Sequence, residues 1–585
     1  MRFSRFCAVV VVLTAAVFAV GITGGHLGAD DWGYTYGCRF VKDGLSWANA
    51  VEAFRDPAHG AIWMPLTYCT YMADISLFGG GWPVHHAVNV FLHAVNAGLV
   101  FAFILMLVRR FSGEPGRAGM WICAWAALVW SLHPMRAEAV TYVASRKEEL
   151  WTMFALLGLF AWARFQVRGR RDGYVWALAC FVLSCLSKPT AVCFVPLAYL
   201  VQVVLTGQWR RRLLGYVPFL VLAFGVGVLA LYSQAHPTGA EEADVFNAGL
   251  GWRMLNAGVS VGLYLFHTIA PTGIHLDYRA VFGGWPVDGG LGLAVLAAAV
   301  LATAGVVLYG TERIRRSVVF SAAWFLFGLL PTLGVFGYVN GDQACADRYT
   351  YLPAIAFSVL LALGALRVVR GKACRFCLLA MLGLVVLETV AVLPVIASFK
   401  DDYAAFSRAL KADPEHWRAL RIVGNEYCAR RGRMGEGVTM LRRSLRARNS
   451  QRTADSLAYV LAIRGQPGDF AEVKRLGAAV AHDFRRDVHG MMLDALAIAY
   501  MREGDDRNAA KLFKASLGVP RRNHSPGHSL LNLGLTLANL GRDAEARMAL
   551  GKAANDANPE VRTRAAEALS AIRAGVKRSR FSWKP

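Results

Sequence analysis

Long apolar stretches separated by short polar turns occupy the first two thirds of the chain. Eleven of them are predicted to form membrane-crossing helices, at 6–23, 86–108, 118–133, 149–165, 174–187, 189–205, 213–232, 291–310, 318–335, 350–368 and 376–398. A further stretch, 254–271, is short and carries Asn256 and His267. The pattern predicts an all-α, polytopic membrane domain over residues 1–398.

After residue 398 the apolar positions follow the period of amphipathic helices instead. Small residues recur at intervals of 34, 39 and 37, at Gly424, Ala458, Ala497 and Gly534. A turn glycine follows three of them, at Gly465, Gly504 and Gly541. This spacing matches the tetratricopeptide unit of about 34 residues, in which small residues lie where paired helices approach closely. We therefore predict a tetratricopeptide-like α-solenoid over 399–575, with a generic helical bundle as the alternative, and a basic tail over 576–585.

Composition supports this division into a membrane half and a soluble half. The 585 residues are 56% apolar and only 18% charged, with a formal net charge of +23. That is too apolar for a protein that is soluble throughout, and it also excludes disorder, collagen and a disulfide scaffold. From Lys400 onward there are 34 basic and 20 acidic residues, so +14 of the net charge lies in the predicted solenoid.

The basic residues of the short loops predict the topology, because such loops face the cytoplasm. Six clusters should be cytoplasmic: Arg2/Arg5, Arg109/Arg110/Arg117, Arg164/Arg168/Arg170/Arg171, Arg210/Arg211/Arg212, Arg313/Arg315/Arg316 and Arg367/Arg370/Lys372/Arg375. An even number of crossings must separate 212 from 313, so 254–271 is predicted to be interfacial or re-entrant. The first span is read as an anchor rather than a cleaved signal peptide.

This topology has eleven crossings, with the N-terminus inside and the solenoid outside. A composition rich in Ala, Arg and Gly favours a bacterial inner membrane with the repeats in the periplasm. In an endoplasmic reticulum membrane the same topology would place the repeats in the lumen.

Unusual polar residues gather on the predicted external side. Asp30 and Asp31 follow the first span, where a carboxylate can act as a general base or merely cap a helix. His86, Asn89 and His93 are spaced i, i+3, i+7 and share one helix face. Polar groups within a span usually face an interior or a cavity, although single histidines in helices are mostly packing residues.

Three external cations, Lys188, Arg146 and Arg348, run against the preference of basic residues for the cytoplasmic side. Arginine forks bind phosphate oxygens, so these residues could hold a lipid-linked phosphate. The competing interpretation is that they form salt bridges with nearby acids, namely Glu138, Glu148, Glu149 or Asp347.

The sequence lacks the motifs that are typical of several other activities. There is no GxxxxGK[ST], HExxH or GxSxG motif, and no basic-aromatic array of the kind that binds nucleic acid. The eleven cysteines are scattered, and the CxxC of Cys374 and Cys377 has no second pair at zinc spacing. We expect no nucleic-acid partner, and we interpret the cysteines as packing residues.

Six stretches in order resemble the transmembrane and tetratricopeptide-repeat-containing O-mannosyltransferases and their bacterial relatives. They are Asp30-Asp31, the His86/Asn89/His93 span, HPMRAEAVTYVASRKEEL (133–150), LSKPT (186–190), the Pro271–Tyr278 stretch ending LDY, and ADRYTYLP (346–353). The resemblance implies a GT-C type membrane glycosyltransferase that moves a sugar from a polyprenyl-phosphate donor to a hydroxyl acceptor, with inversion and without a metal or a cofactor.

The resemblance also implies roles for residues. Asp30 or Asp31 would deprotonate the acceptor, and Lys188 and Arg348, with Arg146 or His133, would hold the leaving phosphate. The cavity and acceptor side would be lined by His86, Asn89, His93, Arg136, Glu138, Asp277, Tyr278 and Tyr351. The repeats would present a protein acceptor. Two rival hypotheses are a polyprenyl-dependent glycosyltransferase acting on lipid or polysaccharide, and a non-enzymatic membrane scaffold.

Overall fold

The computed structural model describes the chain except residues 1, 58, 60, 61, 236–248, 280–288, 336–342, 370–373, 431, 484–489, 520–525, 557 and 575–585. It divides into two compact units, residues 1–412 and residues 413–585. The predicted basic tail and the cluster residues Arg370 and Lys372 lie outside the described residues.

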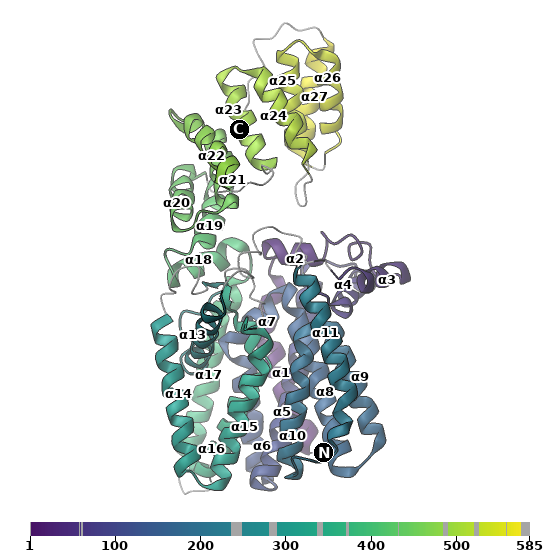
Figure 1. The fold of residues 1–585 in the computed structure, drawn as a ribbon, viewed down its shortest axis with the longest axis vertical. Helices are drawn as coiled ribbons and strands as arrows, with labels where there is room; N and C mark the ends of the chain where they lie inside the picture. Colours follow the sequence, from purple (N-terminus) through teal and green to yellow (C-terminus); the bar gives the residue numbers. More distant parts are fainter. Residues whose placement is uncertain are drawn as a thin grey trace. The chain divides into compact units, whose positions relative to one another are not determined.

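The first unit is a bundle of long helices (Figure 1). Its helices are α1 (Arg2–Phe18), α2 (Gly28–Tyr34), α3 (Trp47–Arg55), α4 (Pro65–Phe78), α5 (Trp82–Ser112), α6 (Gly116–Leu132), α7 (Ala137–Thr141), α8 (Arg146–Arg168), α9 (Arg171–Ser187), α10 (Phe194–Thr206), α11 (Val217–Ala235), α13 (Leu250–Ile269), α14 (Gly289–Tyr309), α15 (Glu312–Leu329), α16 (Ile355–Val369), α17 (Cys374–Ser398) and α18 (Asp402–Ala412).

Within the described residues, eight helical segments are long and apolar enough to cross a membrane. They are Phe3–Thr23, Trp82–Ser112, Val143–Arg168, Pro189–Thr206, Leu213–Ala235, Gly289–Tyr309, Glu312–Thr332 and Phe376–Ser398. Each corresponds to a predicted span. The chain is therefore an integral membrane protein.

The other three predicted spans form shorter helices. α6 and α9 have 17 residues each, and α16 has 15. α13, on the stretch that we predicted not to cross, is not among the eight long apolar segments. α8, which belongs to one of the eight long segments, ends at a glycine. Gly169 follows it with a positive φ of 70°, a conformation that favours glycine.

Short 3₁₀ turns follow or precede several of these helices and carry predicted site residues. They are η3 (Pro134–Arg136) after α6, η4 (Val143–Ser145) before α8, η5 (Pro189–Cys193) after α9, and η10 (Asp347–Thr350) before α16. Further 3₁₀ segments are η1 (Ala19–Thr23), η6 (Leu213–Tyr216) and η9 (Leu330–Thr332). Proline opens both η3 and η5, where its missing N–H costs no hydrogen bond.

A two-stranded antiparallel sheet joins two loops of the first unit. β1 (Tyr278–Arg279) pairs with β2 (Gln343–Cys345), with Tyr278 opposite Cys345. These are the only strands in the described part of an otherwise α-helical chain. They bring the loop after α13 beside η10.

The second unit is a run of paired helices (Figure 1). They are α19 (Trp417–Arg430), α20 (Met434–Ala447), α21 (Gln451–Arg464), α22 (Asp469–Asp483), α23 (Gly490–Glu503), α24 (Asp506–Gly518), α25 (Gly527–Asn539), α26 (Asp543–Ala553) and α27 (Pro559–Arg573). This pairing is consistent with repeats. The helix α18, which we had assigned to the solenoid, lies in the first unit.

The small residues predicted at helix contacts lie at close approaches. A Cβ added to Gly424 would lie 3.1 Å from the carbonyl oxygen of Gly437, and one added to Gly534 would lie 2.5 Å from Cγ of Leu550. Ala458 and Ala497 are fully buried. Small side chains at these points let the paired helices pack closely.

Candidate functional site at the loop ends of the helix bundle

The two adjacent aspartates of α2 have different environments. Asp31 is 1% exposed, and its carboxylate accepts hydrogen bonds from the backbone N–H of Leu27 (2.8 Å) and of Ala144 (2.7 Å). Burial raises the pKa of Asp31 to about 8, although the two N–H donors oppose this shift. Asp31 therefore ties α2 to η4.

Asp30 points elsewhere, because consecutive helical residues are rotated by about 100°. Its side chain is partly exposed, and within the described residues no hydrogen bond or ion pair engages its carboxylate. Asp30 is thus the carboxylate of the pair that is available to a substrate.

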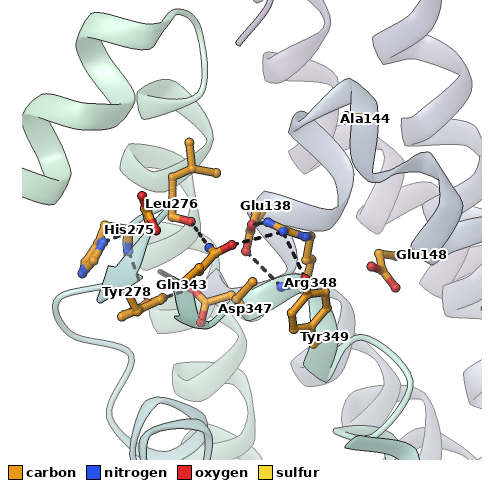
Figure 2. A network of polar contacts seen from close by, with 12 residues as sticks. Glu138, Ala144, Glu148, His275, Leu276, Tyr278, Gln343, Asp347, Arg348 and Tyr349 are labelled. Atoms are coloured by element: carbon orange, nitrogen blue, oxygen red, sulfur yellow. Dashed lines mark hydrogen bonds and ion pairs between the residues drawn. The ribbon is translucent and has the colours of Figure 1, made fainter. Parts of the chain in front are cut away.

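Two predicted cations meet on one aromatic ring. Lys188, directly after α9, places its Nζ 4.7 Å from the ring centroid of Tyr349. Arg348, in η10, places its Cζ 4.9 Å from the same centroid. Figure 2 shows Tyr349 beside Arg348. Cation–π attraction holds both positive groups against the ring, so the structure brings Lys188 and Arg348 together as predicted.

Each of these cations also has a carboxylate partner. Lys188 forms an ion pair with Glu148, and Arg348 with Glu138, which also accepts a hydrogen bond from the backbone N–H of Arg348 (3.0 Å). The salt bridges that we had weighed against phosphate binding are therefore present. Among the residues that the structure describes, Arg348 Nη2 contacts neutral oxygens only, on Gln343 (3.4 Å) and Tyr349 (3.3 Å) (Figure 2).

Burial raises the pKa of Glu138 to about 7, with Arg348 opposing the shift. In the unfolded chain the pKa of a Glu is about 4.3, so the folded protein binds the proton of the Glu138 carboxyl more tightly than the unfolded chain does. The contribution of this proton to the free energy of unfolding is therefore lost as pH rises from about 4 to about 7. Relative to Glu138→Gln, the wild-type midpoint of thermal unfolding should fall by about 2 °C or more between pH 5 and pH 8. Differential scanning fluorimetry in detergent measures this, and a relative rise would contradict it.

Lys147 is a third cation at this site, and we had not assigned it a role. Its Nζ donates to the carbonyl oxygen of Ala144 (2.9 Å) and lies 4.6 Å from the ring centroid of Tyr34. Asp30, Arg348 and Lys188 are among the charges close enough to act on it. Lys147 therefore lies within electrostatic range of the Asp30 carboxylate and of the two cations on Tyr349. The run of charges from Arg146 to Glu149 was the signal for it.

Arg146 lies in a separate buried cluster. Its guanidinium forms an ion pair with Asp74 (2.7 Å) and donates to Asn89 Oδ1 (2.7 Å) and to the carbonyl oxygen of His85 (2.9 Å). His85 Nδ1 also contacts Asp74 (2.7 Å). Arg146 is fully buried. The structure thus uses Arg146 and Asn89 to join α4, α5 and α8 and does not place Arg146 with Lys188 and Arg348.

Another group of predicted residues forms a buried hydrogen-bonded layer. His93 Nδ1 contacts the hydroxyl of Tyr351 (2.7 Å), and Arg136 Nη2 donates to Thr350 Oγ1 (2.6 Å). The Arg136 guanidinium lies 5.7 Å from the ring centroids of both Trp130 and Tyr351. These contacts fix η10 against α5 and α6.

The remaining predicted residues lie around this layer. His86 Nε2 contacts the carbonyl oxygen of Gly25 (2.8 Å), and His133 Nδ1 accepts from the N–H of Met135 (3.3 Å). Tyr278 donates to Asp347 Oδ2 (3.0 Å), and Asp277 is buried beside it (Figure 2 shows Tyr278 and Asp347). In the part of the chain that the structure describes, no three His, Cys, Asp or Glu side chains are grouped so as to hold a metal.

An integral membrane protein with a buried charged site at its helix ends is the class that fold and site define. No family model matches the chain. It is 22% identical over 311 residues to a protein O-mannosyl-transferase of Caenorhabditis elegans, which confirms the resemblance as a distant homology. The match covers 51% of this chain and 41% of the nematode protein, so the chain spans less than half the length of that relative.

Proposed function

We propose that the chain is a membrane glycosyltransferase that transfers a sugar from a polyprenyl-phosphate donor to a hydroxyl on a protein. The observation that carries this proposal is the convergence of Lys188 and Arg348 on the ring of Tyr349, with Lys147 in electrostatic range of both cations and of the Asp30 carboxylate. The distant homology to an O-mannosyl-transferase supports it.

The donor phosphate would bind at the cations. Lys147, Lys188 and Arg348 are three cations at this site, and Glu148 and Glu138 are the ion-pair partners of Lys188 and Arg348. The ion pairs hold the cations in position before the donor arrives, and within the described part of the chain Arg348 Nη2 faces neutral acceptors only. Charges that are already in place stabilise a developing anion without reorganisation. Lys188 and Arg348 would therefore neutralise the polyprenyl phosphate as it leaves.

Asp30 would act as the general base. It takes the proton of the acceptor hydroxyl, the hydroxyl oxygen forms a bond to the anomeric carbon, and the bond from that carbon to the phosphate oxygen breaks. The electron pair leaves with the polyprenyl phosphate. A single displacement of this kind inverts the anomeric carbon. Asp31 would hold α2 in place, because both of its oxygens already accept backbone N–H groups.

Transfer by the purified protein tests this proposal. Wild-type protein in detergent, given a radiolabelled polyprenyl-phosphate mannose, is expected to move label to a protein acceptor or slowly to water, above the rate with heat-inactivated protein. Label that reaches only lipid or polysaccharide would indicate the rival acceptor class. No turnover with mannose, glucose or N-acetylglucosamine donors would reject the proposal in favour of a scaffold.

A further inference from the structure

The segment that carries Asp30 is held by the chain beyond the last span. The backbone N–H of Gly25 donates to the carbonyl oxygen of Lys400 (2.9 Å), and the N–H of Gly28 donates to Asp402 Oδ1 (2.8 Å). Side chains would obstruct both contacts. A Cβ on Gly25 would lie 2.8 Å from the Lys400 oxygen, and one on Gly28 would lie 2.5 Å from Asp402 Oδ2. The two glycines thus permit a close approach over about 375 residues of sequence.

These contacts matter because α2 is short. It has seven residues, and an isolated helix of that length is unstable in water. Its first N–H groups have no partner within the helix. The Asp31 carboxylate accepts from Leu27, and the Asp402 carboxylate accepts from Gly28, which begins the helix. Two carboxylates therefore fix the N-terminal end of α2, and one of them comes from α18.

The helix α18 also contacts the segment that leads to Arg348. Arg408 of α18 donates from Nε to the carbonyl oxygen of Ile274 (2.6 Å), in the loop that leads to β1. β1 pairs with β2, which directly precedes η10 and Arg348. α18 is thus bonded to both segments that frame the site, the one with Asp30 and the one that supports Arg348.

We infer that Asp402 is a positioning residue, which holds α2 so that Asp30 faces the acceptor. This inference rests on the proposed function. Asp402 touches neither donor nor acceptor, so its loss should slow catalysis without weakening donor binding.

The test uses three variants of the full chain. Asp402→Ala removes the acceptor from Gly28, and Asp402→Asn keeps an oxygen that can accept the same N–H. Asp401→Ala is the matched control, because Asp401 Oδ1 caps Ala404 of α18 itself (2.8 Å) and leaves Gly28 with its partner. Asp402→Ala is expected to lower kcat about tenfold with KM for the donor unchanged. Asp402→Asn and Asp401→Ala should stay within about twofold of wild type.

Hydrogen–deuterium exchange gives a readout that does not need activity. Peptides covering residues 25–34 should exchange about tenfold faster in Asp402→Ala than in Asp401→Ala. If the wild type transfers no sugar, the proposed function fails while this exchange result still tests the contact. An active wild type with unchanged kcat in Asp402→Ala, or a change in donor KM alone, would overturn the positioning role.

Discussion

Replacing Asp30 with Asn should lower the rate of sugar transfer by about 10³-fold without changing the thermal stability of the protein. The amide has the same shape but cannot accept the acceptor proton, and a general base contributes about 10²–10⁴-fold. Stability should hold because within the described residues no hydrogen bond or ion pair engages the Asp30 carboxylate. Initial rates with radiolabelled donor and unfolding midpoints in the same detergent measure both quantities.

Asp31→Asn is the matched control for this prediction. Both Asp31 oxygens accept backbone N–H groups, so an amide would turn one acceptor into a donor and leave a buried N–H without a partner. We expect it to cost about 1–3 kcal/mol of unfolding free energy. If Asp30→Asn and Asp31→Asn lost activity and stability to the same extent, the assignment of Asp30 as the base and Asp31 as the structural carboxylate would be wrong.

Replacing Arg348 with Gln should be the most destabilising single change at the site. It leaves Glu138 buried without its ion-pair partner, and removal of one member of a buried pair typically costs about 3–5 kcal/mol. Arg348 holds the pKa of Glu138 down, so its removal raises that pKa further, and the buried carboxyl can then avoid the unpaired charge by taking up a proton. Protonation is easier at pH 6, so the loss should be larger at pH 8 than at pH 6. Chemical unfolding at both pH values, followed by tryptophan fluorescence, measures this difference.

The double variant Glu138→Gln/Arg348→Gln separates stability from function. With neither charge present, most of the unfolding free energy should return, yet transfer should stay at least about 100-fold below wild type because the leaving phosphate has lost a cation. A stable double variant with normal turnover would show that Arg348 serves the fold and not the reaction.

Hydropathy was enough to predict eight of the eleven expected membrane helices. Every one of the eight long apolar segments coincides with a predicted span, because hydrophobic length is a local property of the sequence. The residues at which the helices begin and end were harder to predict from the sequence. α6, α9 and α16 finish or begin at 3₁₀ turns whose geometry depends on residues packed against them, such as Arg136 on Thr350.

Part of the candidate site was also visible in the sequence. Lys188 and Arg348 stood out as basic residues on the side where such residues are rare, and the structure brings them to one ring. Arg146 carried the same signal but pairs with Asp74, 72 residues earlier. Which aspartate of α2 is buried depends on Ala144, 113 residues away. Such long-range pairings leave no local pattern in the chain.

The lengths of three short helices predict the depth at which the site would lie in a bilayer. α6, α9 and α16 have 15–17 residues, and each has arginine at or near the end predicted to be cytoplasmic, Arg117, Arg171 and Arg367. At 1.5 Å per residue they reach about 22–26 Å, less than the hydrocarbon thickness of about 30 Å. The turns at their other ends, with Arg136, Lys188 and Arg348, would then lie slightly below the outer lipid headgroups, at the edge of the hydrocarbon. If the chain binds a lipid-borne phosphate as proposed, the phosphate would meet these cations at that edge, without being lifted into water.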